Sequence, residues 1–486
     1  MSRVLENLEP KPLWHIFEDI CNIPHPSKKE AKIIEYVKNF GEKLGLETIV
    51  DHVGNVIIRK PATPGMEDRQ GIILQGHLDM VPQKNNDTDH DFEKDPIKPW
   101  IDGEWVKAKG TTLGADNGIG AAAALAVLQD NTLQHGLIEV LLTVDEETGM
   151  TGAFELKGGL LQGNILINLD SEDEGELYIG CAGGIDTFAT LKYKEKAVPE
   201  GHVGYKLEVK GLKGGHSGLD INLGRGNANK ILNRALWQAN REMGLELSSF
   251  DGGSLRNAIP REATAVVTIP AKNAAEFEKF VADLEATVKK ELGNVDPDLS
   301  LKATKIDTPG FIINKKTTKR LLDVIYASPN GAMRMISDMP EVVETSTNLA
   351  IIKSAKGKIE IAALQRSSVD SAKEDLANMM RATFKLAGFK VKNSGSYPGW
   401  KPNVNSPILK AMKEVYQNKF GKIPEQKVIH AGLECGILGG NYPGLDMISF
   451  GPTIRNPHSP DEKVNIPTVG LFWEYLVETL KNAPKK

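Results

Sequence analysis

The length, composition and charge of the chain limit what it can be. It has 486 residues, of which 40% are hydrophobic and 25% charged, and its formal net charge is -5. Because a single core usually stops growing at ~250–300 residues, we expect two domains. So small a net charge argues against a mainly electrostatic attachment to nucleic acid.

Neither a membrane segment nor a disulfide framework is expected. The longest apolar stretch, residues 118–128, is shorter than the ~18 residues that a membrane span needs, and the N-terminal sequence lacks the apolar core of a signal peptide. We therefore expect a soluble, cytoplasmic protein. An odd number of widely spaced cysteines is typical of buried thiols rather than of disulfides or zinc knuckles. These cysteines are Cys21, Cys181 and Cys435.

The first third of the chain alternates helical and strand patterns. Ser27 and Glu30 have the spacing of a capping box, and apolar residues of the segment 31–45 then recur at helical intervals, which predicts an amphipathic helix. A second helical pattern, rich in Gly and Ala, covers 118–130. With the apolar runs between them, these patterns predict an α/β sheet with helical crossovers. The runs lie at 55–60, 71–77, 138–144 and 164–170.

From about Thr187 the pattern becomes that of an α+β domain. Helical stretches cover 226–243 and 273–292, and they lie between short runs that are typical of strands. We expect this part to be inserted into the first domain. The strand-like runs are at 187–194, 204–211, 263–270 and 358–364.

The last part of the chain returns to the α/β pattern after the turn-rich YPGW at 397–400. We therefore expect a discontinuous catalytic domain made of residues 1–186 and 399–486, with the second domain, 187–398, inserted between its parts. A helix, a strand and a helix are predicted at 406–421, 445–451 and 469–480.

Acidic and histidine residues follow several of the predicted strands. In an open α/β sheet, ligands bind beyond the carboxyl ends of the strands. One such residue alone is typical of an ordinary polar loop, but several carboxylates on one rim require compensating charge, and divalent cations supply it most simply. The residues are His77, Asp79, Asp116, Asp145, Glu146, Glu147, Asp170 and His458.

His77 and Asp79 stand two residues apart at the end of a predicted strand, so their side chains share a face. That spacing suits a metal-binding imidazole and a partner that orients it. Mixed histidine and carboxylate ligands favour zinc, cobalt or manganese, and they are typical of a catalytic site rather than of a closed, cysteine-rich structural site.

Other segments of the sequence do not require a catalytic or ligand-binding role. GADNGIG at 114–120 matches neither GxGxxG nor GxxxxGK[ST], so we interpret its glycines as allowing close helix packing rather than phosphate binding. The acidic run at 171–176 is expected to be a solvated loop. His430 and Cys435 lack a pattern that favours a thiol hydrolase.

The order of the motifs resembles the M20 family of dimetal peptidases. HLDMVP, GTTLGADNGIG, DEETG, NLDSE, GGHSG and NPHSP follow one another as in that family. VPQKNNDT, GCAGGID, RNAIPRE, YPGW and HAGLECG resemble its aminoacyl-histidine dipeptidase branch, from PLWHIF at 13–18 nearly to the C-terminus. The resemblance implies an α/β zinc-exopeptidase-like catalytic domain, an inserted α+β lid and dimerisation domain, and a homodimer.

The resemblance also implies a cofactor of two divalent metal ions, most simply zinc, with cobalt or manganese as alternatives. His77, Asp116 and Asp170 would bind one ion, while Asp116, Glu147 and His458 would bind the other. Asp116 would bridge the two ions. The peptide bond that follows Asp116 is expected to be cis, as is common in the family.

The catalytic roles follow in the same way. Two metals ~3.5–4 Å apart hold a water molecule and lower its pKa towards ~7. The resemblance makes Glu146 the general base, a role worth ~10²–10⁴-fold in rate. It makes Asp79 the residue that orients His77, and His216 a group that stabilises the tetrahedral intermediate, often from the partner subunit. We interpret Asp145 as structural.

Three further residues are expected to bind substrate. Asn257 resembles a substrate-binding position, and the guanidinium of Arg366 matches a carboxylate bidentately. A carboxylate held at a fixed distance from the metals would favour dipeptides. Glu434 is a candidate contact for the substrate's ammonium or imidazole group, with an ordinary loop role as the alternative.

We therefore expect a metal-dependent dipeptidase that hydrolyses Xaa-His and other unblocked dipeptides. Another reaction of the same site is the nearest alternative, either that of a carboxypeptidase or that of an N-acyl amino acid hydrolase. A peptide-binding protein without catalytic activity is a third alternative. The presence of every implied ligand and of Glu146 argues against it.

Overall fold

The computed structural model describes residues 3–486, which form two compact units. The change of pattern near Thr187 falls inside strand β9 (Gly183–Lys192), whose glycine-rich first half has no strand-like alternation. The sequence also does not indicate that the short segment 429–432 belongs with the second unit. The first unit comprises the residues up to Gly180, Trp400–Val428 and Leu433–Lys486, and the second comprises Cys181–Gly399 and Ile429–Gly432.

A mixed sheet forms the centre of the first unit, in the order β1-β2-β6-β3-β7-β23-β8-β22. Strands β6, β3, β7 and β23 run parallel, and every residue of β3, β6 and β7 is buried. This arrangement confirms the predicted α/β sheet. The strands are β1 (Glu47–Val50), β2 (Val56–Lys60), β3 (Ile72–His77), β6 (Ile138–Thr143), β7 (Ile165–Asn168), β8 (Glu176–Cys181), β22 (Glu425–Ile429) and β23 (Asp446–Ser449).

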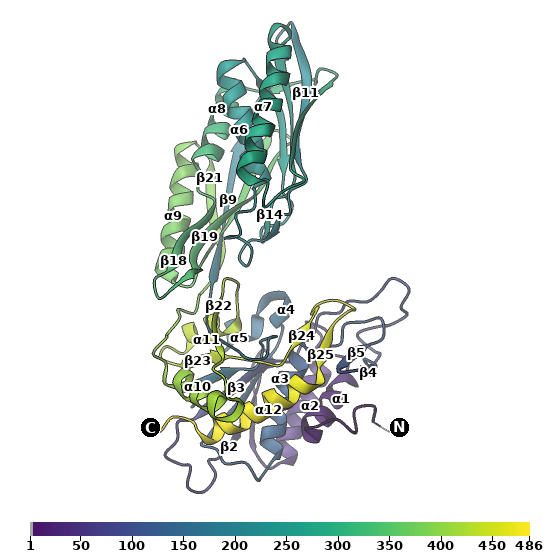
Figure 1. The fold of residues 1–486 in the computed structure, drawn as a ribbon, viewed down its shortest axis with the longest axis vertical. Coiled ribbons are helices and arrows are strands. Elements are labelled where there is room, and N and C mark those ends of the chain that lie inside the picture. The colour runs from purple at the N-terminus through teal and green to yellow at the C-terminus, as the bar shows by residue number, and fades with distance from the viewer. Residues whose placement is uncertain (1–2) are drawn as a thin grey trace. The chain divides into compact units, whose positions relative to one another are not determined.

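Helices flank this sheet (Figure 1). Helix α3 packs on β3, and α1 packs on α3, so α3 is buried on all sides and contains mainly Ala and other apolar residues. Helices α10 and α12 pack on each other. The helices are α1 (Lys11–Cys21), α2 (Ala31–Lys43), α3 (Ala115–Gln129), α4 (Glu146–Gly149), α5 (Thr151–Glu155), α10 (Pro407–Phe420), α11 (Glu434–Asn441) and α12 (Ile466–Lys481).

The predicted capping box at the start of α2 is wrong. Glu30 occupies the N-cap position without a side-chain cap, and it accepts the backbone N–H of Lys28 instead. The hydroxyl of Ser27 donates to Asp79 at 2.8 Å, so a tertiary contact takes the place of the local one.

A small antiparallel sheet in the first unit, in the order β24-β25-β5-β4, carries the loop that contains His458. The loop joins β24 to β25 and is therefore held at both ends. The strands are β4 (Pro99–Asp102), β5 (Trp105–Ala108), β24 (Ile454–Arg455) and β25 (Lys463–Asn465).

The second unit is an antiparallel sheet with helices, as the α+β pattern predicted. Its order is β16-β11-β15-β13-β19-β20-β9-β21, with β18 beside β19. Apolar residues of these strands and of the helices form one core. The helices are α6 (Ala228–Glu242), α7 (Ala274–Leu292), α8 (Lys315–Ala327) and α9 (Asp370–Leu386), with the short η1 (Ala271–Asn273) before α7.

The remaining strands of the second unit complete this sheet and two small ladders, β10 with β17 and β12 with β14. They are β10 (Glu195–Lys196), β11 (His202–Lys210), β12 (Gly215–His216), β13 (Glu246–Gly252), β14 (Ala258–Ile259), β15 (Ala263–Pro270), β16 (Ser300–Ile306), β17 (Ile312–Ile313), β18 (Gly331–Ile336), β19 (Met339–Ala355), β20 (Lys358–Ser367) and β21 (Lys390–Tyr397).

Two expectations from composition can be checked in the structure. Within residues 3–486, none of the helices combines the length and the apolar character needed to cross a membrane. The three cysteines are buried and none forms a disulfide, which confirms their interpretation as buried thiols.

Candidate metal centre

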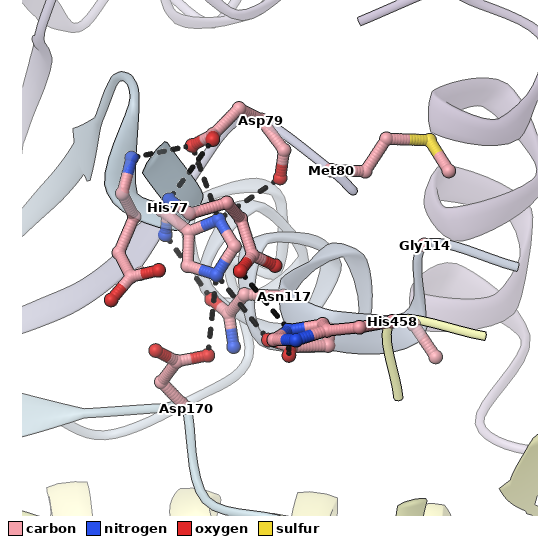
Figure 2. A network of polar contacts seen from close by, with 12 residues as sticks. His77, Asp79, Met80, Gly114, Asn117, Asp170 and His458 are labelled. Carbon is pink, nitrogen blue, oxygen red and sulfur yellow. Dashed lines mark hydrogen bonds and ion pairs between the residues drawn. The ribbon is translucent and has the colours of Figure 1, made fainter. Parts of the chain in front are cut away.

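The parallel strands β6, β3 and β7 end side by side, and the predicted ligands follow them. His77 is the last residue of β3, Glu147 lies in α4 just after β6, and Asp170 follows β7. Figure 2 shows the side chains of His77, Asp170 and His458 directed towards one region. The topology of the sheet therefore brings together residues that are far apart in the sequence.

These residues form two groups that share one carboxylate. In the first group, His77 Nε2 lies 3.3 Å from Asp116 Oδ1 and 3.5 Å from Asp170 Oδ1. In the second, His458 Nε2 lies 3.2 Å from Asp116 Oδ2 and 3.0 Å from Glu147 Oε2. In each group the possible ligand atoms all lie within 4.8 Å of one another. The two groups have the same members as the two predicted ligand sets.

Asp116 can serve both groups because its backbone leaves the helical conformation. Its φ and ψ are -85° and 107°, although it stands in the first turn of α3. The peptide bond between Asp116 and Asn117 is cis, as expected. The side chain of Asn117 donates to the carbonyl oxygen of Leu169 at 2.6 Å, which ties this turn to the strand end before Asp170.

Among the described residues, no hydrogen bond of good geometry reaches two buried carboxylate oxygens at this centre. They are Oε1 of Glu147 and Oδ1 of Asp170, the latter 3.5 Å from His77 Nε2. A buried polar atom without a partner costs ~1–3 kcal/mol, and more when it is charged. Divalent cations prefer ligands of this kind, and each group offers two carboxylates and one imidazole. The residues present therefore fit metal ions.

The pKa shifts at the centre arise from burial and from the closeness of several carboxylates. Burial raises the pKa of Asp170 well above its ordinary value, and the charge of Asp116 adds to this effect. Hydrogen bonds to Asp116 and Glu147 raise the pKa of His458 to about 11. Burial opposes a charge on His77, yet the carboxylates of Asp170 and Asp116 raise its pKa well above 6.5. Without cations, these groups therefore hold protons, which compensate the carboxylate charge that divalent cations would otherwise balance.

Asp79 connects His77 to the start of α4. His77 Nδ1 donates to the backbone oxygen of Asp79 at 2.9 Å and lies 3.4 Å from its Oδ1. The carboxylate of Asp79 also accepts the backbone N–H groups of Glu146 and Glu147, at 2.9 and 3.2 Å. Burial opposes its charge, but hydrogen bonds from His77 and Glu146 lower the pKa of Asp79 to about 2. One carboxylate therefore holds both the imidazole and the acidic turn.

The three consecutive acids have different surroundings. Asp145 is buried, has a φ of 53°, and accepts hydrogen bonds from the hydroxyls of Thr148 and Thr151, which agrees with a structural role. Burial raises the pKa of Glu146 well above 4.5, and His77 opposes this shift less strongly than burial favours it. A carboxylate that binds a proton readily suits acid–base chemistry.

Glu434 begins α11 in the first unit and is 1% exposed. Its Oε2 accepts hydrogen bonds from Gln75 Nε2 at 2.6 Å and from Thr143 Oγ1 at 2.8 Å. Its Oε1 has no hydrogen-bond partner within the part of the chain that the structure describes. Asn168 donates to Gln75, and Ser449 donates to Asn168, so a buried polar chain extends from Glu434 across the strand ends. Burial raises the pKa of Glu434 to about 7.

The sequence analysis did not identify this series of hydrogen-bonded polar side chains, nor one other residue, Glu462. Gln75 and Asn168 lie inside apolar runs, where the sequence shows them only as isolated polar residues. Glu462 is buried and accepts the N–H groups of four successive residues at the start of α3. It ends the segment HSPDE at 458–462, four residues after His458, and that proximity was the available signal.

The second unit brings His216 and Arg366 together. The N–H groups of Gly218 and Leu219 donate to His216 Nδ1 at 3.2 and 3.0 Å, so a neutral ring carries its hydrogen on Nε2. Burial and the charge of Arg366 lower the pKa of His216 to about 4. The imidazole is therefore neutral.

Arg366 is buried in β20 without an acidic partner among the described residues. It is 5% exposed, and its Nη1 donates to the hydroxyl of Tyr397 at 2.9 Å while its Nη2 lies 3.4 Å from His216 Nε2. A buried cation without a counterion favours an anionic ligand. Asn257 is exposed, and its backbone oxygen accepts the N–H of Ser217 at 2.8 Å.

The chain is similar to known proteins in both sequence and fold. A model of Peptidase family M20/M25/M40 matches residues 73–482. The chain is 50% identical over 482 residues to cytosol non-specific dipeptidase of Escherichia coli (strain K12), with 99% of each chain covered. Its structure matches the crystal structure of aminoacylhistidine dipeptidase from Vibrio alginolyticus with a TM-score of 0.96 and 49% identity, covering 100% of this chain and 99% of that one.

A more distant match shares the fold alone. The crystal structure of aminopeptidase PepT from Bacillus cereus has a TM-score of 0.57 and 18% identity, and the match covers 98% of this chain and 99% of that one. The family match and the two close relatives confirm the resemblance that the order of the motifs indicated. The chain belongs to the peptidase family M20/M25/M40.

Proposed function

We propose that the protein is a metal-dependent dipeptidase that hydrolyses Xaa-His and other unblocked dipeptides. The observation that carries the proposal is the pair of histidine and carboxylate groups that share Asp116. The names of the two close relatives, one a non-specific dipeptidase and the other an aminoacylhistidine dipeptidase, support the substrate class.

His77, Asp116 and Asp170 would hold one divalent cation, and Asp116, Glu147 and His458 the other. Zinc is the proposed metal, with cobalt or manganese as alternatives. Bound cations of this kind lower the pKa of a water molecule and polarise the scissile carbonyl group.

The chain's own residues then move the protons. Glu146 accepts a proton from the attacking water and returns it to the leaving amine. Asp79 keeps His77 in one orientation through Nδ1. His216 donates from Nε2 to the oxygen that becomes negative in the tetrahedral state.

Substrate recognition rests on groups of opposite charge. The guanidinium of Arg366 binds the terminal carboxylate, because it is buried and has no acidic partner in the described part of the chain. Glu434 offers the substrate's ammonium or imidazole group a carboxylate oxygen that has no hydrogen-bond partner among residues 3–486. Asn257 is proposed to contact the substrate as well.

A turnover panel tests the proposal. The protein is treated with a chelator, dialysed and reconstituted with zinc, cobalt or manganese, and the metal is counted per chain. Carnosine, other dipeptides, a tripeptide and an N-acetyl amino acid are then compared as substrates. Hydrolysis of the dipeptides alone, lost on chelation and restored by metal, supports the proposal. Activity that survives exhaustive chelation contradicts it, and preference for the tripeptide or the N-acetyl compound favours a carboxypeptidase or an acyl hydrolase.

We also propose that the protein is a cytoplasmic homodimer and that its second unit contributes lid and dimer contacts. The name of the cytosolic Escherichia coli relative supports the location. Light scattering on the metal-loaded protein tests the dimer, and a monomeric mass at the concentrations used for the activity assays contradicts it.

A further inference from the structure

Glu462 closes the N-terminal end of the helix that carries Asp116. The backbone N–H groups of Leu113 and Gly114 donate to its Oε2 at 2.7 and 3.0 Å. Those of Ala115 and Asp116 donate to its Oε1 at 2.8 and 3.2 Å. The side chain is 2% exposed, so these four amides are its hydrogen-bond donors within a buried environment.

The N-cap residue of α3 cannot accept these N–H groups with a side chain of its own. Helix α3 begins at Ala115, and its N-cap residue is Gly114, which has a φ of 73° and no side chain. A helix start normally uses the side chain of a local Ser, Thr, Asp or Asn to accept its free N–H groups. The conformation of residues 113–116 therefore depends on a carboxylate that is distant in the sequence.

The turn that carries Glu462 also carries His458. The N–H of Glu462 donates to the backbone oxygen of Ser459 at 3.0 Å, and that of Asp461 donates to Ser459 Oγ at 3.0 Å. His458 itself has a φ of 59°, a left-handed conformation that its surroundings must maintain. Glu462 thus joins the segment of Asp116 to the turn of His458 by a contact separate from the ligand groups.

We propose that Glu462 is a positioning residue, which sets the separation of Asp116 from His458 without binding metal itself. The proposal rests on the proposed function, because it takes Asp116, Glu147 and His458 to bind a cation. The two carboxylate oxygens of Glu462 each accept two of the four amides. A glutamine would keep one oxygen and turn its NH₂ group towards two N–H donors, which leaves buried donors unsatisfied.

The substitution Glu462→Gln tests the proposal through metal binding rather than through activity. We expect the parent to bind two ions per chain. The variant should bind the ion held by Glu147 and His458 ~10–100-fold more weakly, which is the usual loss when a residue that orients a metal ligand is changed. The ion held by His77 and Asp170 should keep nearly its parental affinity. Isothermal titration with zinc, and the visible absorption of the cobalt-loaded protein, separate the two ions.

Glu18→Gln is the matched control. Glu18 is also a buried carboxylate, 7% exposed, and accepts the N–H groups of Val4 and Leu5 at 2.8 and 3.0 Å. Both variants should lower the melting temperature, but only Glu462→Gln should weaken one of the two ions. Equal losses of metal affinity in the two variants overturn the proposal, as does parental binding of both ions by Glu462→Gln.

Glu462→Asp is a second variant for the case that the glutamine variant does not fold. It keeps the charge but is shorter, so we expect the same selective loss of one ion to a smaller extent. Unchanged affinity for both ions in a folded Glu462→Asp overturns the proposal. Fewer than two ions in the parent protein contradict the proposed function and this proposal with it.

Discussion

At the scale of single residues, the carboxylate of Glu146 differs from those of its acidic neighbours, because among the described residues it makes no hydrogen bond or ion pair. The carboxylate of Asp145 accepts hydrogen bonds from two hydroxyl groups, and Glu147 Oε2 lies 3.0 Å from His458 Nε2. We expect Glu146→Gln to lower kcat by ~10²–10⁴-fold, the usual worth of a general base, because an amide does not accept the proton. KM and the number of metal ions per chain should change little.

Steady-state kinetics on a dipeptide and metal analysis check this prediction. Glu155→Gln is a suitable control, because Glu155 is an exposed carboxylate, 57% exposed, in the neighbouring helix α5. Turnover of Glu146→Gln at the parental rate would show that another group takes the proton.

The buried His430 predicts a dependence of stability on pH. Burial, together with the charge of Arg366 and with His216, lowers its pKa to about 3, and Ser346 Oγ lies 2.7 Å from its Nε2. The unfolded chain therefore binds this proton more tightly than the folded chain does. The stability that neutral His430 provides is complete above pH ~6.5 and decreases as the pH falls from 6.5 towards 3.

Urea denaturation between pH 8 and 4 measures this effect. His430→Gln, which has no titratable group, should lose less stability over this range than the parent, while His52→Gln, at an exposed histidine, 44% exposed, should match the parent. Parallel curves for the parent and His430→Gln would contradict the prediction. The comparison cancels the titration of the metal centre, which all three proteins share.

The sequence predicted those site residues that follow strands and failed where contacts join distant loops. His77, Glu147 and Asp170 follow runs of buried apolar residues, so the rule for parallel sheets brings them together. Glu462 acts through backbone amides of residues more than 340 positions away, and amides leave no trace in side-chain patterns. Gln75 was missed because a polar residue inside a buried strand has no periodicity that identifies its partner.

At the scale of elements, the structure confirms that the glycines of GADNGIG allow close packing. A Cβ atom on Gly120 would lie 2.3 Å from the backbone oxygen of Leu169, and on Gly118 it would lie 3.0 Å from Phe17. We expect Gly120→Ala to destabilise the protein by ~1–3 kcal/mol, the usual cost of overpacking, because the backbone must move. Since Leu169 precedes Asp170, metal affinity should fall as well.

Gly470→Ala is the matched control, because Gly470 also lies in a helix, α12. Apart from its chain neighbours and the adjacent backbone of that helix, no described atom lies within 4 Å of its added Cβ. This variant should be neutral or more stable by ~0.5–1 kcal/mol, since alanine favours the helix. Urea denaturation of both variants checks the pair. Equal stability changes would mean that packing at α3 is looser than its contacts indicate.

Elements of the second unit were harder to predict where polar residues are buried. Strand β19 is 17 residues long, and its buried middle contains Thr345, Ser346, Thr347 and Asn348. These residues pair with side chains of neighbouring strands, as Thr345 does with Ser367 at 2.9 Å. A polar run of this kind resembles a loop in the sequence, so strand patterns did not identify it.

At the scale of the whole molecule, the pattern of the chain indicated one domain inserted into another, and the structure has two units built from alternating segments. The segment 429–432 of the second unit is too short to carry a periodic pattern. Its assignment depends on contacts such as that of His430 with Ser346, which only the folded chain contains.

Metal ions should control the stability of the chain, because the centre concentrates buried carboxylates. A ligand present at ~1,000 times its Kd stabilises a protein by ~4 kcal/mol. We therefore expect chelation to lower the melting temperature of the parent. Asp170→Asn should have opposite effects in the two states, since burial and the charge of Asp116 oppose the ionisation of Asp170 when no cation is bound.

Thermal denaturation with chelator and with zinc distinguishes these effects. With chelator, Asp170→Asn should melt above the parent, because an amide avoids the free energy needed to bury or to protonate this carboxyl group. With zinc it should melt below the parent, because a ligand is lost. Asp173→Asn, at an acid that is 41% exposed and pairs with Arg455, should follow the parent in both conditions. If zinc stabilises Asp170→Asn as much as the parent, Asp170 is not a ligand, and the charges at the strand ends must be balanced in another way.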